Sequence, residues 1–111
     1  MYKYRVRPGY GSKNVLIEFM VNSENTDFVA ILKEVFDQAE IVTTKKEDLW
    51  MNDEVLYHMV GECGEFQLSS DNWGSIFILA NENQKAIGYL SNLLINSGAF
   101  IEEVVDAENY S

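Results

Sequence analysis

The sequence contains one histidine and one cysteine, side chains that serve readily as a general base and a nucleophile. His58 lies between Tyr57 and Met59 in a segment that is typical of a strand, and Cys63 follows five residues later. Nucleophilic catalysis needs a base positioned beside the nucleophile, and no local signature of a cysteine protease surrounds Cys63. We therefore interpret His58 as a strand histidine and Cys63 as an incidental thiol, and we predict that the protein is not an enzyme.

The same side chains argue against a bound metal. One histidine and one cysteine cannot complete a tetrahedral zinc site without help from carboxylates. The acids Glu47, Asp48, Asp53 and Glu54 are dense enough for calcium, but they lack the alternating ligands, central glycine and terminal glutamate of an EF-hand loop. We predict no metal ion and no other cofactor.

The glycine-containing segment from Pro8 to Lys13 invites comparison with phosphate-binding loops. Its spacing fits neither the dinucleotide fingerprint nor the nucleotide P-loop, and it leads into a strand pattern instead of a helix. We interpret it as the turn of a β-hairpin. Paired carboxylates stay open as an alternative, because their pairing is spatial and the chain has 18 acids. A small enzyme that uses such a pair, or His58, is therefore a third class of function.

Two tryptophans lie next to acidic residues: Trp50 within the segment Glu47 to Glu54, and Trp73 shortly after Asp71. Tryptophan is enriched among the residues that dominate binding at protein interfaces, where polar groups surround an aromatic anchor. The alternative is that each indole packs onto the end of a sheet, since tryptophan is usually well buried. We predict a partner-binding surface made of seven residues: Glu47, Asp48, Trp50, Asp53, Glu54, Asp71 and Trp73.

The formal net charge of −10 arises from 18 acidic and 8 basic residues. This balance argues against direct binding to nucleic acid or to an anionic membrane, because phosphate contacts need a basic surface. The stretch from Glu47 to Asp71 contains seven acids and no base, whereas residues 1–13 contain four bases and no acid. A surface that attracts a basic protein is one interpretation, and a surface that serves solubility alone is the other.

The bases at the N-terminus alternate with apolar residues, a pattern typical of a half-buried strand. Opposite charges across neighbouring strands are favourable. We therefore expect Lys3, Arg5 and Arg7 to face the acids of a neighbouring strand, or Glu102 and Glu103 near the C-terminus.

The remaining apolar residues also show strand and helix periods. Alternation and short apolar runs predict strands over residues 2–7, 15–21, 41–44, 55–60, 66–69, 75–80 and 99–105. Residues 45–54 are predicted to form a charged loop. Helical spacing predicts one helix through residues 28–36, with an N-cap at Ser23, Asn25 or Thr26. A second helix is expected to begin at a capping box of Asn81 and Gln84 and to end at Gly98 in the left-handed conformation.

This order predicts a single α+β domain over residues 1–111, with a mainly antiparallel sheet of about six strands and two helices packed on one face. The longest apolar runs have the length of strands, and the N-terminus lacks the basic start and apolar core of a signal peptide. A single cysteine fits a reducing compartment. We therefore expect a cytoplasmic protein.

The segment from Phe66 to Val105 contains a turn at Asp71 to Gly74, an apolar strand, a helix that ends at Gly98, and a last strand. In this order, and in its size and acidity, the chain resembles the immunity proteins of bacterial toxin systems, including contact-dependent growth inhibition. The resemblance implies a cytoplasmic inhibitor that binds a cognate toxin domain, often a basic nuclease, and blocks its active site. It assigns no role to an individual residue, because members of this class differ greatly in sequence.

The leading hypothesis is therefore a non-enzymatic acidic domain that binds and neutralises a cognate basic toxin. The alternative is a regulatory or nucleic-acid-mimic module, or an accessory subunit of a larger assembly. The partner distinguishes the two hypotheses, because a mimic would bind a host DNA-binding protein. Fold class alone does not choose between them.

Overall fold

The computed structural model describes residues 2–9, 13–21, 25–49, 53–71 and 74–103. Its two helices are α1, Thr26–Gln38, and α2, Lys85–Asn96. Its strands are β1 Tyr2–Pro8, β2 Val15–Phe19, β3 Val42–Leu49, β4 Glu54–Gly61, β5 Gly64–Asp71, β6 Ile76–Leu79 and β7 Phe100–Glu102. Within the described ranges, neither helix has the length and hydropathy needed to cross a membrane.

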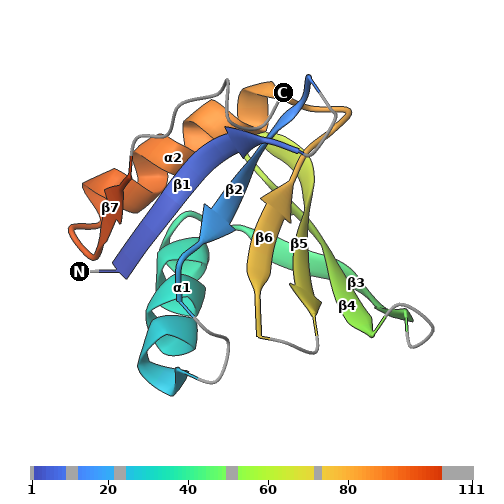
Figure 1. The fold of residues 1–111 in the computed structure, drawn as a ribbon, viewed down its shortest axis with the longest axis horizontal. Coiled ribbons are helices and arrows are strands. Elements are labelled where there is room, and N and C mark those ends of the chain that lie inside the picture. The colour runs from blue at the N-terminus through green and yellow to red at the C-terminus, as the bar shows by residue number, and fades with distance from the viewer. Residues whose placement is uncertain (1, 10–12, 22–24, 50–52, 72–73, 104–111) are drawn as a thin grey trace.

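The seven strands form one sheet in the order β3-β4-β5-β6-β2-β1-β7 (Figure 1). Neighbouring strands run antiparallel, except that β1 and β7 pair in parallel. The α+β class is as expected, but the predicted sheet of about six strands is corrected to a mixed sheet of seven. The parallel pair exists because α2 carries the chain from β6 across to the far edge of the sheet, a connection that a tight turn cannot make.

The helix α1 buries one side that the sequence spacing indicated: Phe28, Leu32, Val35 and Phe36 are all buried. Of the three possible N-caps, Asn25 is the one observed, and its side-chain oxygen accepts a hydrogen bond of 3.1 Å from the backbone N–H of Phe28. The local sequence therefore determines both where this helix begins and which side it buries.

The helix α2 begins at Lys85, so the predicted capping box of Asn81 and Gln84 is wrong. The side chain of Gln84 instead accepts a hydrogen bond of 2.8 Å from the backbone N–H of Val15 and donates one of 2.9 Å to the carbonyl of Ala80. A contact to β2, distant in sequence, thus replaces the local cap. At the other end, Gly98 has a φ of 79°, which confirms the predicted left-handed stop.

Both helices cover the same face of the sheet, as predicted. Tyr4 and Phe19 lie opposite each other in β1 and β2 and point to this face. The hydroxyl of Tyr4 lies 2.8 Å from that of Ser91 in α2, and the ring of Phe19 lies 5.3 Å from that of Phe28 in α1. The hydrophobic core therefore lies between this face and the helices.

The opposite side, which we call the open face, is covered by neither helix. Arg5 and Arg7 of β1 point to it and approach the carboxylate of Glu18 in β2 at 3.1 and 3.0 Å. The expected pairing with a neighbouring strand is confirmed for these two arginines. Lys3 lies on the same face and is exposed, while Glu102 lies on the helix side, near Ser91.

Candidate functional site

The strand β3 extends further than predicted, and this changes where the predicted partner-binding acids lie. Residues 45–49, expected to belong to a charged loop, continue the strand to Leu49 and pair with β4. Because β3 is an edge strand with mostly exposed side chains, it shows no apolar alternation that would reveal it in the sequence. The backbone pairing with β4 makes this segment a strand, although its own side chains are mostly not buried.

Alternation along β3 and β4 distributes the acids between the two faces of the sheet. Glu47 and Glu54 point to the open face, whereas Asp48 points to the face that carries the helices. Asp53 is exposed in the turn before β4, where its φ is 53°. The hairpin of β3 and β4 reaches away from both helices (Figure 1). The predicted acids therefore lie near one another without forming a single surface.

Glu54 and Asp71 are cross-strand neighbours at the ends of β4 and β5. Two like charges in this position repel each other, but each carboxylate accepts a hydrogen bond from the protein. The hydroxyl of Ser69 donates to Glu54 at 2.7 Å, and the backbone N–H of Ser75 donates to Asp71 at 2.9 Å. These bonds hold the two carboxylates at defined positions on the open face.

Glu47 lies beside His58 and Lys45. Its carboxylate is 2.5 Å from Nε2 of His58 and 3.6 Å from the ammonium group of Lys45. The hydrogen bond from His58, followed by the charge of Lys45, lowers the pKa of Glu47 below its usual value. These three residues line a shallow pocket of about 320 Å³, together with Glu65 and Gln67.

The histidine and the cysteine do not form the nucleophile and base that were considered above. His58 pairs with Glu47, and the thiol of Cys63 donates only a weak contact of 3.9 Å to the carbonyl of Gly64. Burial raises the pKa of Cys63, which keeps this thiol protonated and poorly nucleophilic. The hydroxyl of Thr44, which lines the same shallow pocket, donates to the backbone carbonyl of His58.

Two of the seven predicted site residues, Trp50 and Trp73, lie outside the described residues. The structure brings together Glu47, Glu54 and Asp71 on the open face. It also places Lys45 beside Glu47 on this face, because Lys45 belongs to β3 and not to a loop. The ammonium group of Lys46 lies on the helix side, 5.8 Å from the centre of the Tyr57 ring.

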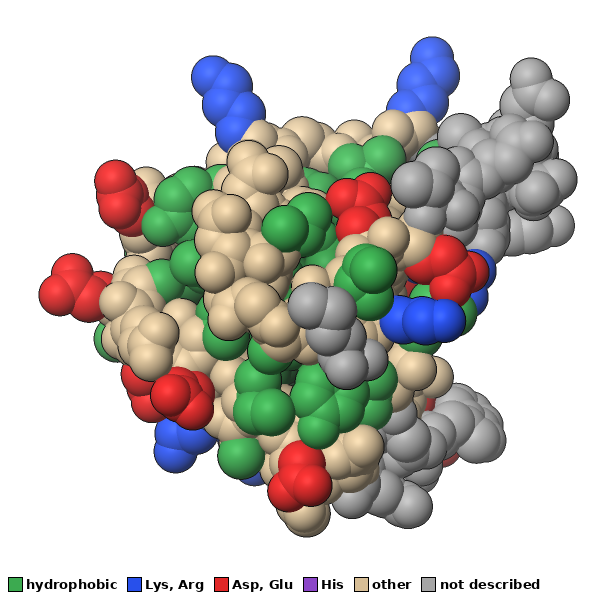
Figure 2. All heavy atoms as spheres, turned by 90° about the vertical axis from the view of Figure 1, so that its left-hand side faces the viewer, with side chains coloured by type: hydrophobic (Ala, Val, Ile, Leu, Met, Phe, Trp, Pro, Cys, Tyr) green, Lys and Arg blue, Asp and Glu red, His purple; other side chains and the backbone are tan. Residues whose placement is uncertain are grey.

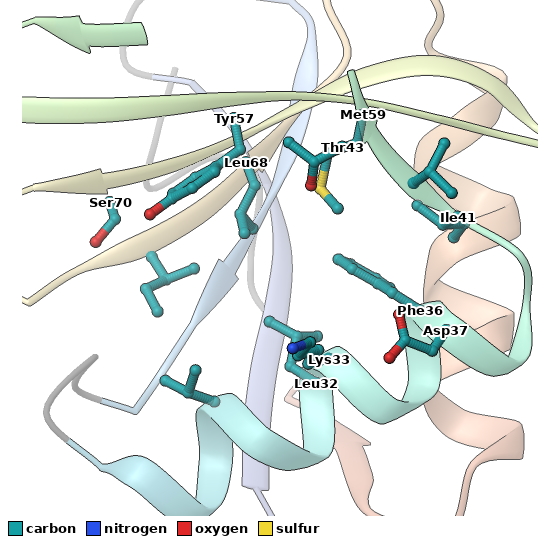
Figure 3. A pocket seen from close by; sticks show the side chains of 13 residues that line it. Leu32, Lys33, Phe36, Asp37, Ile41, Thr43, Tyr57, Met59, Leu68 and Ser70 are labelled. Atoms are coloured by element: carbon teal, nitrogen blue, oxygen red, sulfur yellow. The ribbon is translucent and has the colours of Figure 1, made fainter. Parts of the chain in front are cut away.

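A groove of about 550 Å³, which the sequence did not reveal, lies between α1 and the strands β3, β4 and β5. Leu32 and Phe36 rise from α1 toward Met59 and Leu68, which point down from the strands (Figure 3). Its buried lining residues are Leu32, Phe36, Ile41, Met59 and Ile76. The lining comes from segments far apart in the chain, so no local pattern could have indicated it.

Two valines at the groove are exposed although they are apolar. Val29 of α1 is 42% exposed and Val42 of β3 is 55% exposed. Comparable apolar residues occur elsewhere, with Ile95 at 45% and Ile101 at 48%. On the side that carries α2 and β7, however, apolar side chains reach the surface in small patches separated by polar ones (Figure 2). Val29 borders the groove from α1, whereas Val42 is paired with Val60 and its side chain points to the open face.

Comparisons with protein-family models, curated proteins and solved structures found no match for this chain. Within the described ranges, His, Cys, Asp and Glu side chains form no group that could hold a metal ion. The candidate sites are therefore defined by their geometry: an acidic end of the open face, and an apolar groove on the helix side of the same three strands.

Proposed function

We propose that the protein is a non-enzymatic binding domain that neutralises a basic protein, in the manner of the immunity proteins that bind a cognate bacterial toxin. The proposed contact surface is the acidic end of the open face, formed by Glu47, Glu54 and Asp71. Asp48 and Asp53 extend its negative field at the margin of the hairpin. Trp50 and Trp73 are the proposed aromatic anchors, since both follow these acids closely in the sequence.

One observation carries this proposal: the protein itself holds the three carboxylates in position. His58, Ser69 and the backbone of Ser75 each provide a hydrogen bond to one of them. A carboxylate that is already oriented loses less conformational entropy when a partner arginine or lysine binds to it. Neither α1 nor α2 covers this face, which leaves its carboxylates accessible from the side opposite to the helices.

The charge distribution supports a basic partner in the same way. The segment from Glu47 to Asp71 contributes seven acids, against the two lysines of β3 that precede it. Such a surface accelerates association with a positively charged protein, and the acceleration decreases as salt screens the charges. The proposal includes a cytoplasmic site of action and a partner such as a basic nuclease, as the resemblance implies.

The direct test uses the protein encoded by the neighbouring gene, which for an immunity protein is the toxin. Binding is measured calorimetrically at two salt concentrations, for wild type and for the double variant Glu54→Gln, Asp71→Asn. Both amides retain an oxygen that accepts the bonds from Ser69 and Ser75, so the fold is preserved. We expect about tenfold weaker binding with a smaller salt dependence, because two charges are lost.

The matched control is the double variant Glu82→Gln, Glu103→Gln, which removes two exposed acids away from the hairpin. Its affinity should stay within about twofold of wild type. Equal losses of affinity in both double variants would contradict the proposal. It would also be contradicted if the protein neither binds the neighbouring gene product nor protects cells from it. Capture of a host DNA-binding protein that DNA displaces would favour the nucleic-acid mimic instead.

A further inference from the structure

The centre of the open face is apolar. Phe77 and Leu79 of β6 point to this face, because they alternate with two isoleucines that are buried on the helix side. Leu56 of β4 lies in the same row as Phe77, since both pair with Ser69 of the strand between them. All three apolar side chains are half-buried, although both helices lie on the other side of the sheet. Within the described ranges, no second layer packs on this apolar centre.

The margins of the open face are also apolar in part. Three of the five large apolar residues that the structure shows as exposed point to it: Met20 at 39%, Val42 at 55% and Ile101 at 48%. Ile101 pairs with Lys3, and the backbone N–H of Met20 bonds to the carbonyl of the same lysine. Val42 pairs with Val60. Apolar side chains spread over one face in this way are typical of a surface that another protein covers.

The open face is large enough for a stable interface. With strands about 4.8 Å apart and about 3.4 Å of length per residue, the seven strands span a face of roughly 700 Å². The relief of the side chains adds to this planar area. Stable interfaces bury about 800 Å² on each partner. Two sheets can pack face to face about 10 Å apart with their strands nearly aligned, so a second sheet is a suitable cover.

The charges on the open face have opposite signs at its two ends. The β1 end carries the exposed Lys3 and the two arginines that share the carboxylate of Glu18. Among the described residues, the end formed by β3, β4 and β5 carries four acids and one lysine: Glu47, Glu54, Glu65, Asp71 and Lys45. A purely basic protein fits only one of these ends, whereas a second copy of the chain carries both signs.

A two-fold axis along β6 brings the opposite ends of two copies together. β6 is the middle strand of the seven, with three strands on either side (Figure 1). Rotation by 180° about this strand therefore places β1 of one copy over β4 of the other. The rings of Phe77 of the two copies then meet at the axis. The same patch serves both copies, as in other symmetric dimers.

One row of residues across the sheet shows how the charges match. The row runs from Lys3 through Met20, Ser75 and Asp71 to Glu54. Rotation about β6 reverses the row, so that Lys3 of each copy lies over Glu54 of the other. This contact of opposite charges therefore forms twice in the pair.

We infer that two copies of the chain associate through their open faces about a two-fold axis along β6, with Phe77 at the centre and Lys3 of each copy opposite Glu54 of the other. The inference goes beyond the proposed function, because it requires no other protein. The net charge of −10 on each copy opposes association, but physiological salt screens this repulsion beyond about 8 Å, whereas the opposite charges at the interface lie closer. Because the acidic end takes part in both contacts, the proposed basic partner would bind in place of the second copy.

The first test is the oligomeric state of the full-length protein, measured by sedimentation equilibrium at physiological salt. We expect wild type to form a dimer with a Kd of about 10 μM or tighter. Phe77→Ser removes two rings at the axis and should weaken the dimer at least about tenfold. The matched control Ile95→Ser changes an exposed apolar side chain of α2 and should alter the Kd less than about twofold. A wild type that stays monomeric up to about 100 μM, or equal effects of the two variants, would overturn the inference.

The second test exchanges charges between the copies. Lys3→Glu places like charges opposite each other at both contacts of the pair, and Glu54→Lys does the same. Each variant alone should therefore weaken the dimer at least about tenfold. An equal mixture of the two variants restores opposite charges at both contacts, so mixed dimers should form with a Kd within about threefold of wild type. A mixture that associates no better than either variant alone would overturn the two-fold arrangement.

A dimer that pairs at the edge of the sheet is a distinct outcome. Thr44→Pro removes a backbone donor from the edge strand β3 and blocks pairing there. A dimer that persists in Phe77→Ser and is lost in Thr44→Pro would overturn the inference. If wild type is monomeric but binds the neighbouring gene product, the dimer inference fails and the proposed function stands. If the charge exchange restores the dimer but the neighbouring gene product does not bind, the proposed function fails and the dimer inference stands.

Discussion

The two ends of the sheet are built differently. At the end formed by β1, β2 and β7, the rings of Tyr2, Phe19 and Phe100 surround Phe28 of α1. Its two arginines share the single carboxylate of Glu18 on the open face, so basic groups exceed acidic ones in this cluster. At the end formed by β3, β4 and β5, α1 leaves a groove, and the acids exceed the lysines.

The proposed function implies different roles for the two ends of this small domain. A surface that binds a partner must keep apolar and charged groups accessible, which lowers the stability that those groups could otherwise contribute. The tightly packed end supplies that stability. We therefore expect substitutions at the β1–β2–β7 end to affect folding and those at the β3–β5 end to affect binding.

The largest effect is expected at the packed end. Phe28→Ala should lower the free energy of unfolding by about 3 to 5 kcal/mol, because it removes a fully buried ring and leaves a cavity. Urea denaturation measures the loss. Val42→Ala in the edge strand β3 serves as the comparison and should change stability by less than about 0.5 kcal/mol, since Val42 is exposed. Similar losses in the two variants would remove the distinction between the ends.

A smaller effect is expected from two matched tyrosines. Tyr4→Phe should cost about 1 to 2 kcal/mol, because the buried hydroxyl bonds to the side chain and the carbonyl of Ser91 and ties β1 to α2. Tyr57→Phe, at the groove, should stay within about 0.5 kcal/mol, because Tyr57 is only half-buried. Thermal denaturation of both variants measures the two losses of stability. A greater loss for Tyr57→Phe than for Tyr4→Phe would contradict the view that the β1–β2–β7 end contributes more to stability.

The smallest effect concerns the pH dependence of the acidic end. His58 and Lys45 hold the pKa of Glu47 below its unfolded value, so the pair stabilises the fold above the ordinary glutamate pKa of about 4.3. That contribution is lost as pH falls through the lowered pKa of the folded state. Urea denaturation of wild type and Glu47→Gln between pH 3 and 6 should therefore show stabilities that converge toward low pH.

The control for this measurement is Glu65→Gln, which changes a carboxylate that lines the same shallow pocket. Its stability difference from wild type should vary less with pH than that of Glu47→Gln. If the stability difference of Glu65→Gln from wild type varies more with pH, the bond between Glu47 and His58 is not the main source of the pH dependence of stability on this face.

The two helices show which features the local sequence can predict and which it cannot. The spacing of Phe28, Leu32 and Phe36 predicted α1, because a helix that packs on a sheet must repeat its apolar residues every three to four positions. The start of α2 was predicted wrongly, because the side chain of Gln84 bonds to the backbone of Val15, far away in the chain, and of Ala80 instead of capping the helix. Local cap residues predict a helix start only where no distant group competes for them.

The candidate sites show the same limit. The sequence indicated an acidic segment and two tryptophans, but it placed Glu47 in a loop, whereas Glu47 belongs to a strand paired with β4. Its contact with His58 depends on the register of β3 and β4, which an exposed edge strand does not encode in its own pattern. The groove lies beyond any local signal, because its lining joins α1 to three strands.

By itself, the sequence determined the α+β class, the order of the elements, the buried side of α1 and the stop of α2 at Gly98. These follow from local spacing and backbone preferences, which act over a few residues. The tertiary structure decided the parallel pairing of β1 with β7, the division of the acids between two faces, and the groove beside α1. Each of these depends on pairings between distant segments, and only the packing of the whole chain selects them.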